Sequence, residues 1–111
     1  MESGLYHITI YYPFKNNFLP HNVYDIKYCP HSLEMARERK ILLPKNIYRC
    51  VIPEVQVSQG KIVKALYRTG YSVNQDICLV LHIIDDAPYM VRTVWINHKQ
   101  HQIVVNRNRY I

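Results

Sequence analysis

Apolar side chains along this sequence recur mainly in short runs that are typical of β-strands. The most apolar run, residues 76–84, carries apolar side chains on both faces, which predicts a strand in the centre of a sheet. β-Branched and aromatic residues also dominate residues 5–12, which are followed by Pro13. Further extended segments are predicted at 23–28, 55–57, 62–67, 89–97 and 102–105.

Two segments follow helical patterns instead. The first helix is predicted over residues 31–41, where Ser32 suits the N-cap position and charged residues suit both ends of the helix dipole. The second is predicted over residues 44–52, because Pro44 suits the first helical position and Pro53 would end the helix. Its apolar residues fall at positions i, i+3 and i+4, namely Ile47, Cys50 and Val51.

The order of these elements predicts one α+β domain covering residues 1–111. Two short helices would pack on one face of an antiparallel sheet of four or five strands. A chain of 111 residues can bury one core without disulfides or metals. Its content of 49% hydrophobic residues is that of a globular protein and excludes an intrinsically disordered one.

The positive charge of the chain favours a polyanionic partner. The formal net charge is +6 and the pI is about 9.3, and cations of this kind displace the counterions that condense on nucleic acid. No run of cations exceeds the pair Arg39 and Lys40, so the sequence has no basic tail. Ten tyrosines against two phenylalanines add amphipathic rings, which suit half-buried sheet faces and binding surfaces.

The cysteines and the absence of long apolar runs predict the compartment. The three cysteines, Cys29, Cys50 and Cys78, are odd in number and widely spaced, which favours reduced thiols in a cytoplasmic protein over a disulfide framework. No signal-peptide pattern is present, and no apolar run approaches the roughly 18 residues of a membrane span. We therefore expect a soluble cytoplasmic protein, although a toxin domain cut from a larger secreted protein would look the same.

The first predicted helix carries candidate catalytic residues. His31 lies one residue before the predicted N-cap, where the helix dipole favours a neutral imidazole that can accept a proton. Arg37 and Arg39 could each bind a phosphate through two parallel hydrogen bonds. The alternatives are a surface or capping histidine and two solvated arginines paired with Glu34 and Glu38.

Later strands and turns supply the other candidates. Thr93 and Arg92 are adjacent on one strand and project from opposite faces of it. His98 and His101 lie in or beside a turn, where they could transfer protons. They could also bind zinc, although their spacing is less regular than that of a zinc finger. His82 interrupts the apolar central strand, and we predict a core histidine that is satisfied by a backbone group.

One combination of residues is shared with a known family. It consists of a helix that carries His31, Arg39 and Ile41, a second short helix, and a late strand at residues 91–95. This combination resembles the pattern of small RelE-like toxin domains of the barnase, EndoU, colicin and RelE superfamily. Ser32 and Met35 stand where alanine and a first arginine are usual. The resemblance covers about residues 28–97 and implies a RelE/barnase-like fold and, for some members, RNA cleavage.

The resemblance and the basic charge together predict a metal-independent endoribonuclease toxin. A ribose 2′-hydroxyl would attack the adjacent phosphate, with an acid, a base and cations around the phosphorane. The predicted catalytic residues are His31, Arg39, Thr93, His98 and His101. The predicted RNA-binding residues are Arg37, Arg92, Lys99, Tyr67 and Arg68, with the tyrosines offering stacking faces for bases.

Partners and alternatives follow from the same prediction. A toxin of this type requires a cognate antitoxin or immunity protein, and it needs neither a cofactor nor a metal. The alternative is a non-catalytic basic module of a virus or mobile element that binds nucleic acid or a protein. A third possibility, a zinc-binding domain, predicts that chelation lowers stability.

Overall fold

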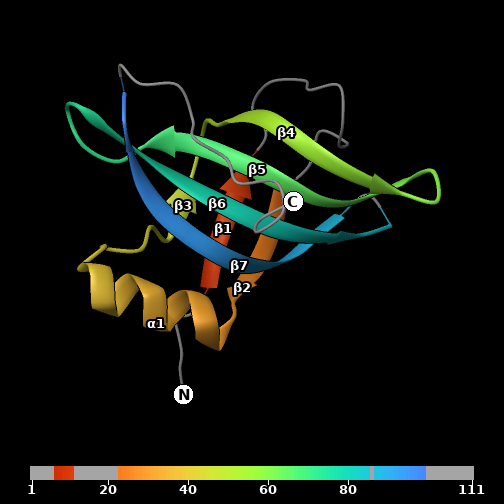
Figure 1. The fold of residues 1–111 in the computed structure, drawn as a ribbon, viewed down its shortest axis with the longest axis horizontal. Helices are drawn as coiled ribbons and strands as arrows, with labels where there is room; N and C mark the ends of the chain where they lie inside the picture. Colours follow the sequence, from red (N-terminus) through yellow and green to blue (C-terminus); the bar gives the residue numbers. More distant parts are fainter. Residues whose placement is uncertain (1–6, 12–22, 86, 100–111) are drawn as a thin grey trace.

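The computed structural model describes residues 7–11, 23–85 and 87–99. These residues form seven strands and one helix (Figure 1). In chain order the elements are β1 His7–Tyr11, β2 Val23–Tyr28, α1 Pro30–Arg39, β3 Asn46–Ile47, β4 Val51–Ser58, β5 Lys61–Gly70, β6 Gln75–Ile84 and β7 Ala87–His98. α1 has ten residues, and nowhere in the described part of the chain does a helix have the length and apolarity needed to cross a bilayer.

All seven strands belong to one mixed sheet with the order β3-β1-β2-β7-β6-β5-β4. Strands β4 to β7 form an antiparallel meander, and β1 pairs antiparallel with β2. Two parallel pairs complete the sheet, β1 with β3 and β2 with β7. The predicted RelE/barnase-like architecture of two helices on a four- or five-stranded antiparallel sheet is therefore wrong, because the described chain has one helix and a larger mixed sheet.

The sheet curls into a half-barrel (Figure 1) because its two edge strands are joined by only three residues. β3 ends at Ile47 on one edge and β4 begins at Val51 on the other. Four residue steps of extended chain span at most about 14 Å. The two edges must therefore approach each other at this end, and residues 48–50 cross the gap between them.

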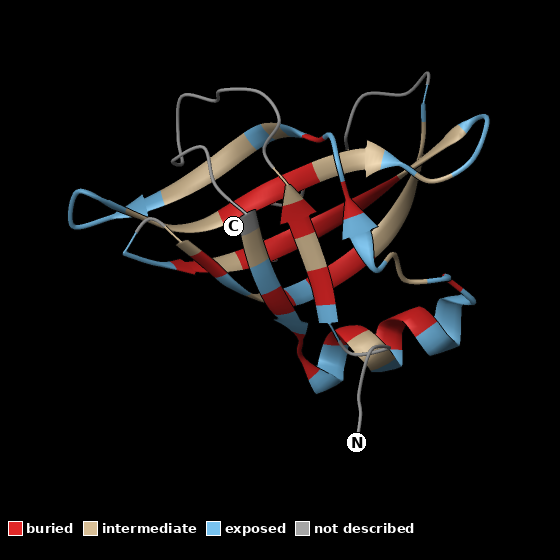
Figure 2. Ribbon diagram, turned by 180° about the vertical axis from the view of Figure 1, so that it is seen from behind, coloured by how far each residue is buried: buried red, intermediate tan, exposed pale blue. Residues whose placement is uncertain are grey.

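The core lies between the concave, inner face of the sheet and α1, and Figure 2 shows buried residues on both. β6 lies between β5 and β7, which confirms the prediction of a central strand. Its alternate side chains Ile77, Leu79, Leu81 and Ile83 belong to the main cluster with Met35 and Ala36 of α1. Cys78 and Val80 face the opposite, outer side, where they pack with Leu66. Both faces of β6 are thus buried, as the apolar sequence requires.

α1 confirms the first predicted helix, but its N-cap differs from the prediction. Cys29 is the N-cap residue, with its Sγ accepting from the backbone N of Ser32 at 3.4 Å. Ser32 lies inside the first turn and is fully buried, and its hydroxyl donates to the carbonyl of Cys29 at 2.8 Å. Pro30 takes the first helical position, where its missing N–H costs nothing.

The N-terminal residues of α1 and Arg39 near its end cover the part of β7 that β2 leaves open. β2 pairs with β7 only at Met90 and Val91. Beyond them, the Sγ of Cys29 donates to the carbonyl of Arg92 at 3.4 Å, and the Nη1 of Arg39 donates to the carbonyl of Val94 at 3.0 Å. The helix therefore satisfies strand-edge carbonyls that would otherwise have no partner in the sheet.

The second predicted helix, residues 44–52, does not form. Its first carbonyl, that of Pro44, accepts from the hydroxyl of Tyr28 at 2.7 Å, and the carbonyl of Lys45 accepts from the backbone N of Thr9 at 2.8 Å. Ile47 is buried beside Ile10 of β1. Pairing with a strand far away in sequence therefore takes the backbone groups that a helix would have used. The predicted last strand, residues 102–105, lies outside the described residues.

Candidate functional site

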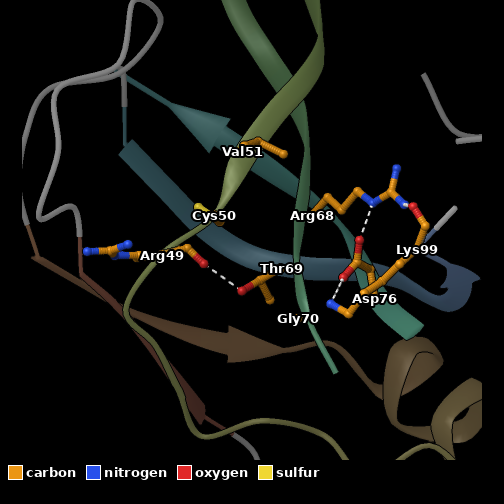
Figure 3. Close-up of a pocket in the computed structure, with 8 residues that line it drawn as sticks. All are labelled: Arg49, Cys50, Val51, Arg68, Thr69, Gly70, Asp76 and Lys99. Carbon is orange, nitrogen blue, oxygen red and sulfur yellow. Dashed lines mark hydrogen bonds and ion pairs between the residues drawn. The ribbon is translucent and has the colours of Figure 1, made fainter. Parts of the chain in front are cut away.

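A pocket of about 580 Å³ lies beside the segment that crosses between the sheet edges (Figure 3). It is lined by that segment, the starts of β4 and β6, the end of β5 and the residue after β7. The lining residues are Arg49, Cys50, Val51, Arg68, Thr69, Gly70, Asp76 and Lys99. Three of them are cationic and one is acidic, so we call it the cationic pocket.

Asp76 organises two of the three cations. One carboxylate oxygen accepts from the Nε of Arg68 and the other from the Nζ of Lys99, both at 2.6 Å (Figure 3). Only 15% of the Arg68 and Asp76 side chains is exposed, against 38% of Lys99. Burial alone would raise the pKa of Asp76, but the hydrogen bonds and charges of Lys99 and Arg68 outweigh it and hold that pKa below its usual range.

Arg68 also fixes the chain at the end of β7. Its Nη2 donates to the carbonyl of His98 at 3.3 Å and to that of Lys99 at 3.5 Å. A planar guanidinium with several donors can make such a set of contacts, whereas a lysine in its place could not. Arg68 thus ties β5, β6 and β7 together and places His98 next to the pocket.

Arg49 contributes the third cation in a different way. Its backbone carbonyl accepts from the Oγ1 of Thr69 at 2.5 Å, which attaches the crossing segment to β5. Its guanidinium points away from the Arg68–Asp76 pair (Figure 3). Within the described residues, the Arg49 side chain makes no hydrogen bond or ion pair, so its donors remain open to a ligand.

The pocket suits anion binding better than covalent chemistry. Three cations and one carboxylate leave it with an excess of two positive charges, and Arg and Lys are the usual phosphate ligands. Burial raises the pKa of the Cys50 thiol to about 12, so this thiol is protonated near neutral pH and is a poor nucleophile. Among the described residues, no group of three or more His, Cys, Asp and Glu side chains could hold a metal ion.

Two predicted RNA-binding residues, Arg68 and Lys99, line the pocket, and His98 adjoins it. The helix residues do not line it. His31 is exposed in the first turn of α1, Arg39 is bonded to the backbone of β7, and Arg37 is exposed beside Glu34 at 3.8 Å. The structure therefore separates the candidates on α1 from the cations of the pocket.

Three further candidates also lie away from the pocket. Thr93 is buried on the outer face, opposite Val80 of β6. Arg92 is exposed on β7. Tyr67 is fully buried in the core, so its ring offers no face for stacking a base. His101 lies outside the described residues.

His82 differs from its predicted role. The sequence predicts a backbone partner, but the buried Nε2 of His82 has no hydrogen-bond partner within the described residues. The ring of Tyr89 meets the imidazole edge-on, with ring centroids 6.1 Å apart. Burial lowers the pKa of His82, and the positive charges of Lys64 and Arg92 lower it further. This side chain therefore favours the neutral form in the folded protein.

Sequence reasoning missed Arg49 and Asp76. Arg49 stood within the second predicted helix, where it had no special position. Asp76 lay at the start of the central strand, and only the pairing of β6 with its neighbours brings it to Arg68 and Lys99. The sequence does contain one relevant signal at Asp76, because an acidic residue at the end of a mostly apolar strand needs a cationic partner.

Comparison with known proteins gives no identification. No family model, no curated protein and no solved structure matches this chain. The RelE-like resemblance therefore stays a prediction.

Proposed function

We propose that the protein binds RNA and that the cationic pocket holds a backbone phosphate. The observation that carries this proposal is the pairing of Arg68 and Lys99 with the carboxylate of Asp76 in a pocket that Arg49 also lines. Charges that were simply dispersed over the surface would not gather at one pocket from distant parts of the sequence. The basic charge of the whole chain supports the same partner through long-range attraction.

Each cation has a separate part in the proposed complex. Asp76 holds Arg68 and Lys99 in fixed positions, which reduces the entropy that these side chains lose on binding. Lys99 is partly exposed and keeps two N–H donors beyond its bond to Asp76. Arg49 is exposed, and its fork of donors fits the oxygens of a phosphate.

The test is binding of a fluorescent single-stranded RNA, followed by anisotropy across a range of salt concentrations. Lys99→Gln and Arg49→Gln should each weaken binding and reduce the salt slope by about 0.7, the value for one phosphate contact on a single strand. Lys61→Gln is the matched control, because Lys61 is exposed at the start of β5 and lies outside the cationic pocket. Equal losses in all three variants would contradict a phosphate site at the pocket.

A second candidate is metal-independent cleavage of the bound RNA. The observation that favours it is the place of His98, whose carbonyl is bonded to Arg68 at the edge of the pocket. In this reaction the 2′-oxygen bonds to phosphorus while the bond from phosphorus to the 5′-oxygen breaks, which leaves a 2′,3′-cyclic phosphate and a 5′-hydroxyl. A base takes the 2′-proton, an acid protonates the leaving oxygen, and Lys99 stabilises the phosphorane.

This candidate assigns His98 to one of the two proton transfers. A neutralising antitoxin or immunity protein belongs to the same proposal, because an unrestrained ribonuclease harms its host cell. The test is incubation with total RNA in the presence of EDTA. His98→Gln should abolish cleavage and leave RNA binding unchanged. If the unaltered protein leaves RNA intact, cleavage is refuted and only the binding function stands. If cleavage is lost only in His31→Ala, the reaction takes place at α1 and not at the pocket.

A further inference from the structure

Two tyrosine rings form a stacked pair beside the crossing segment. Tyr11 is the last residue of β1 and Tyr48 is the first residue after β3. Their ring centroids are 4.9 Å apart and their planes differ by 9°. The parallel pairing of Ile10 with Ile47 brings them together, so the stack continues the register of the sheet. Offset stacks of this kind hold both rings in place.

Tyr48 is exposed although the residues before both tyrosines are buried. Ile10 and Ile47, the residues just before the two tyrosines, are buried in the core. Tyr48 itself is 62% exposed. One face of its ring lies against Tyr11, so the exposed area belongs to the other face and to the edge. The result is a flat aromatic surface with its orientation already fixed.

Tyr48 does not line the cationic pocket itself, but it is next in sequence to residues that do. Tyr48 is followed directly by Arg49, and residues 49–51 line the pocket. The hydrogen bond from Thr69 to the carbonyl of Arg49 fixes this connection to β5. An aromatic face and a cation on adjacent residues are the two components with which proteins bind single-stranded nucleic acid.

We propose that Tyr48, supported by Tyr11, stacks an unpaired base of the RNA whose phosphate occupies the cationic pocket. This inference rests on the proposed RNA-binding function and adds a preference for single-stranded RNA. In a duplex the bases are stacked on each other and offer no free face, whereas a single strand can turn one base outward. The site therefore selects single-stranded RNA over double-stranded RNA, and Tyr48 is the residue that determines this selection.

The experiment uses the full chain and a single-stranded RNA oligonucleotide that carries the fluorescent base 2-aminopurine, with a duplex of the same sequence as the comparison. Stacking on Tyr48 should quench 2-aminopurine fluorescence on binding. Tyr48→Leu should weaken single-strand binding by about 5- to 150-fold, the range for loss of one stacked base, and should abolish the quenching. Tyr48→Phe keeps the ring and should restore both. Duplex binding should be weak and unchanged by either substitution.

Tyr89→Leu is the matched control, because Tyr89 is also an exposed tyrosine but lies on β7 against His82. Melting temperatures of all variants show whether each one folds. Wild-type protein that binds the single strand without quenching, or that binds the duplex equally well, overturns the inference and leaves phosphate binding intact. Single-strand binding that is unchanged in a folded Tyr48→Leu protein overturns it too. Failure of the wild-type protein to bind any RNA overturns the proposed function itself.

Discussion

Arg39 and Val94 are joined by a hydrogen bond of 3.0 Å from the Nη1 of the arginine to the carbonyl oxygen, across 55 positions of sequence. The bond fixes the C-terminal end of α1 to the open edge of β7. Arg39→Ala should therefore lower the free energy of unfolding by about 1 to 2 kcal/mol, because a charge-assisted bond to a strand carbonyl is lost. Urea denaturation measures this change.

Arg37→Ala is the control for that substitution. Arg37 lies on the same helix, but its side chain is 79% exposed and only reaches Glu34 at 3.8 Å. Exposed pairs of this kind contribute about 0.5 kcal/mol or less. Similar losses in both variants would show that helix charge, and not the bond to Val94, stabilises the protein.

The bonds of Asp76 predict a specific acid sensitivity. Its folded-state pKa is depressed, so the carboxylate contributes stability that is fully present above its ordinary pKa near 4 and is lost as the pH falls through the lower folded value. Asp76→Asn should lower the free energy of unfolding by about 2 kcal/mol at pH 7. Below about pH 4, the free energy of unfolding of this variant should fall less steeply with pH than that of the wild type.

Asp85→Asn provides the matched comparison for Asp76. Asp85 has the same side chain, but it is 82% exposed and its oxygen is 3.9 Å from the Nζ of Lys61. Its substitution should leave both the stability at pH 7 and the acid profile nearly unchanged. Chemical denaturation at several pH values measures both variants, and an acid profile of Asp76→Asn that follows the wild type would contradict the assigned ion pairs.

His82 predicts an effect in a milder pH range. Its pKa is lowered in the folded state by burial, Lys64 and Arg92, so the unfolded chain binds a proton first as the pH falls below about 6.5. Stability should therefore decrease on acidification from pH 7.5 to pH 5.5. His82→Gln should show a smaller decrease, which urea midpoints at the two pH values can measure. If His82→Gln and the wild type lose the same stability between these two pH values, the pH dependence comes from another histidine.

The end of α1 offers a stabilising substitution. Lys40 adopts a left-handed conformation with φ 57° and ψ 42°, and its backbone N–H bonds to carbonyls of the last turn. A side chain with a Cβ is strained there, whereas glycine is not. Lys40→Gly should raise the free energy of unfolding by about 0.5 to 1 kcal/mol. Lys40→Ala removes the same charge but keeps the Cβ, so in thermal denaturation it should show no gain.

Local patterns predicted the elements that depend on local forces. The alternation around Leu79 indicated a central strand, and the caps and charges near His31 indicated α1. The segment around Ile47 was misleading, because its apolar residues fit a helix by spacing alone. Its actual partner, Ile10 of β1, lies 37 positions earlier and could not be identified from periodicity. Without that pairing, the size of the sheet and its curl could not be predicted.

The candidate site was predictable to a similar extent. The charge of the chain directed attention to Arg68 and Lys99, both of which line the cationic pocket. Composition indicated tyrosines at a binding surface, but it could not distinguish the buried Tyr67 from the exposed Tyr48. That distinction depends on which face of a strand meets the core and on how the sheet edges are connected, and both are properties of the assembled fold.

The parallel pairing of Lys27 with Met90 sets the order in which the protein can fold. β4 to β7 are joined by short turns, so their contacts form early and at small entropic cost. Joining β2 to β7 instead closes a loop of more than sixty residues, and α1 can dock on β7 only alongside that step. We therefore expect the meander to form first and the N-terminal strands to add last, which makes mutations in β2 act mainly on the unfolding rate.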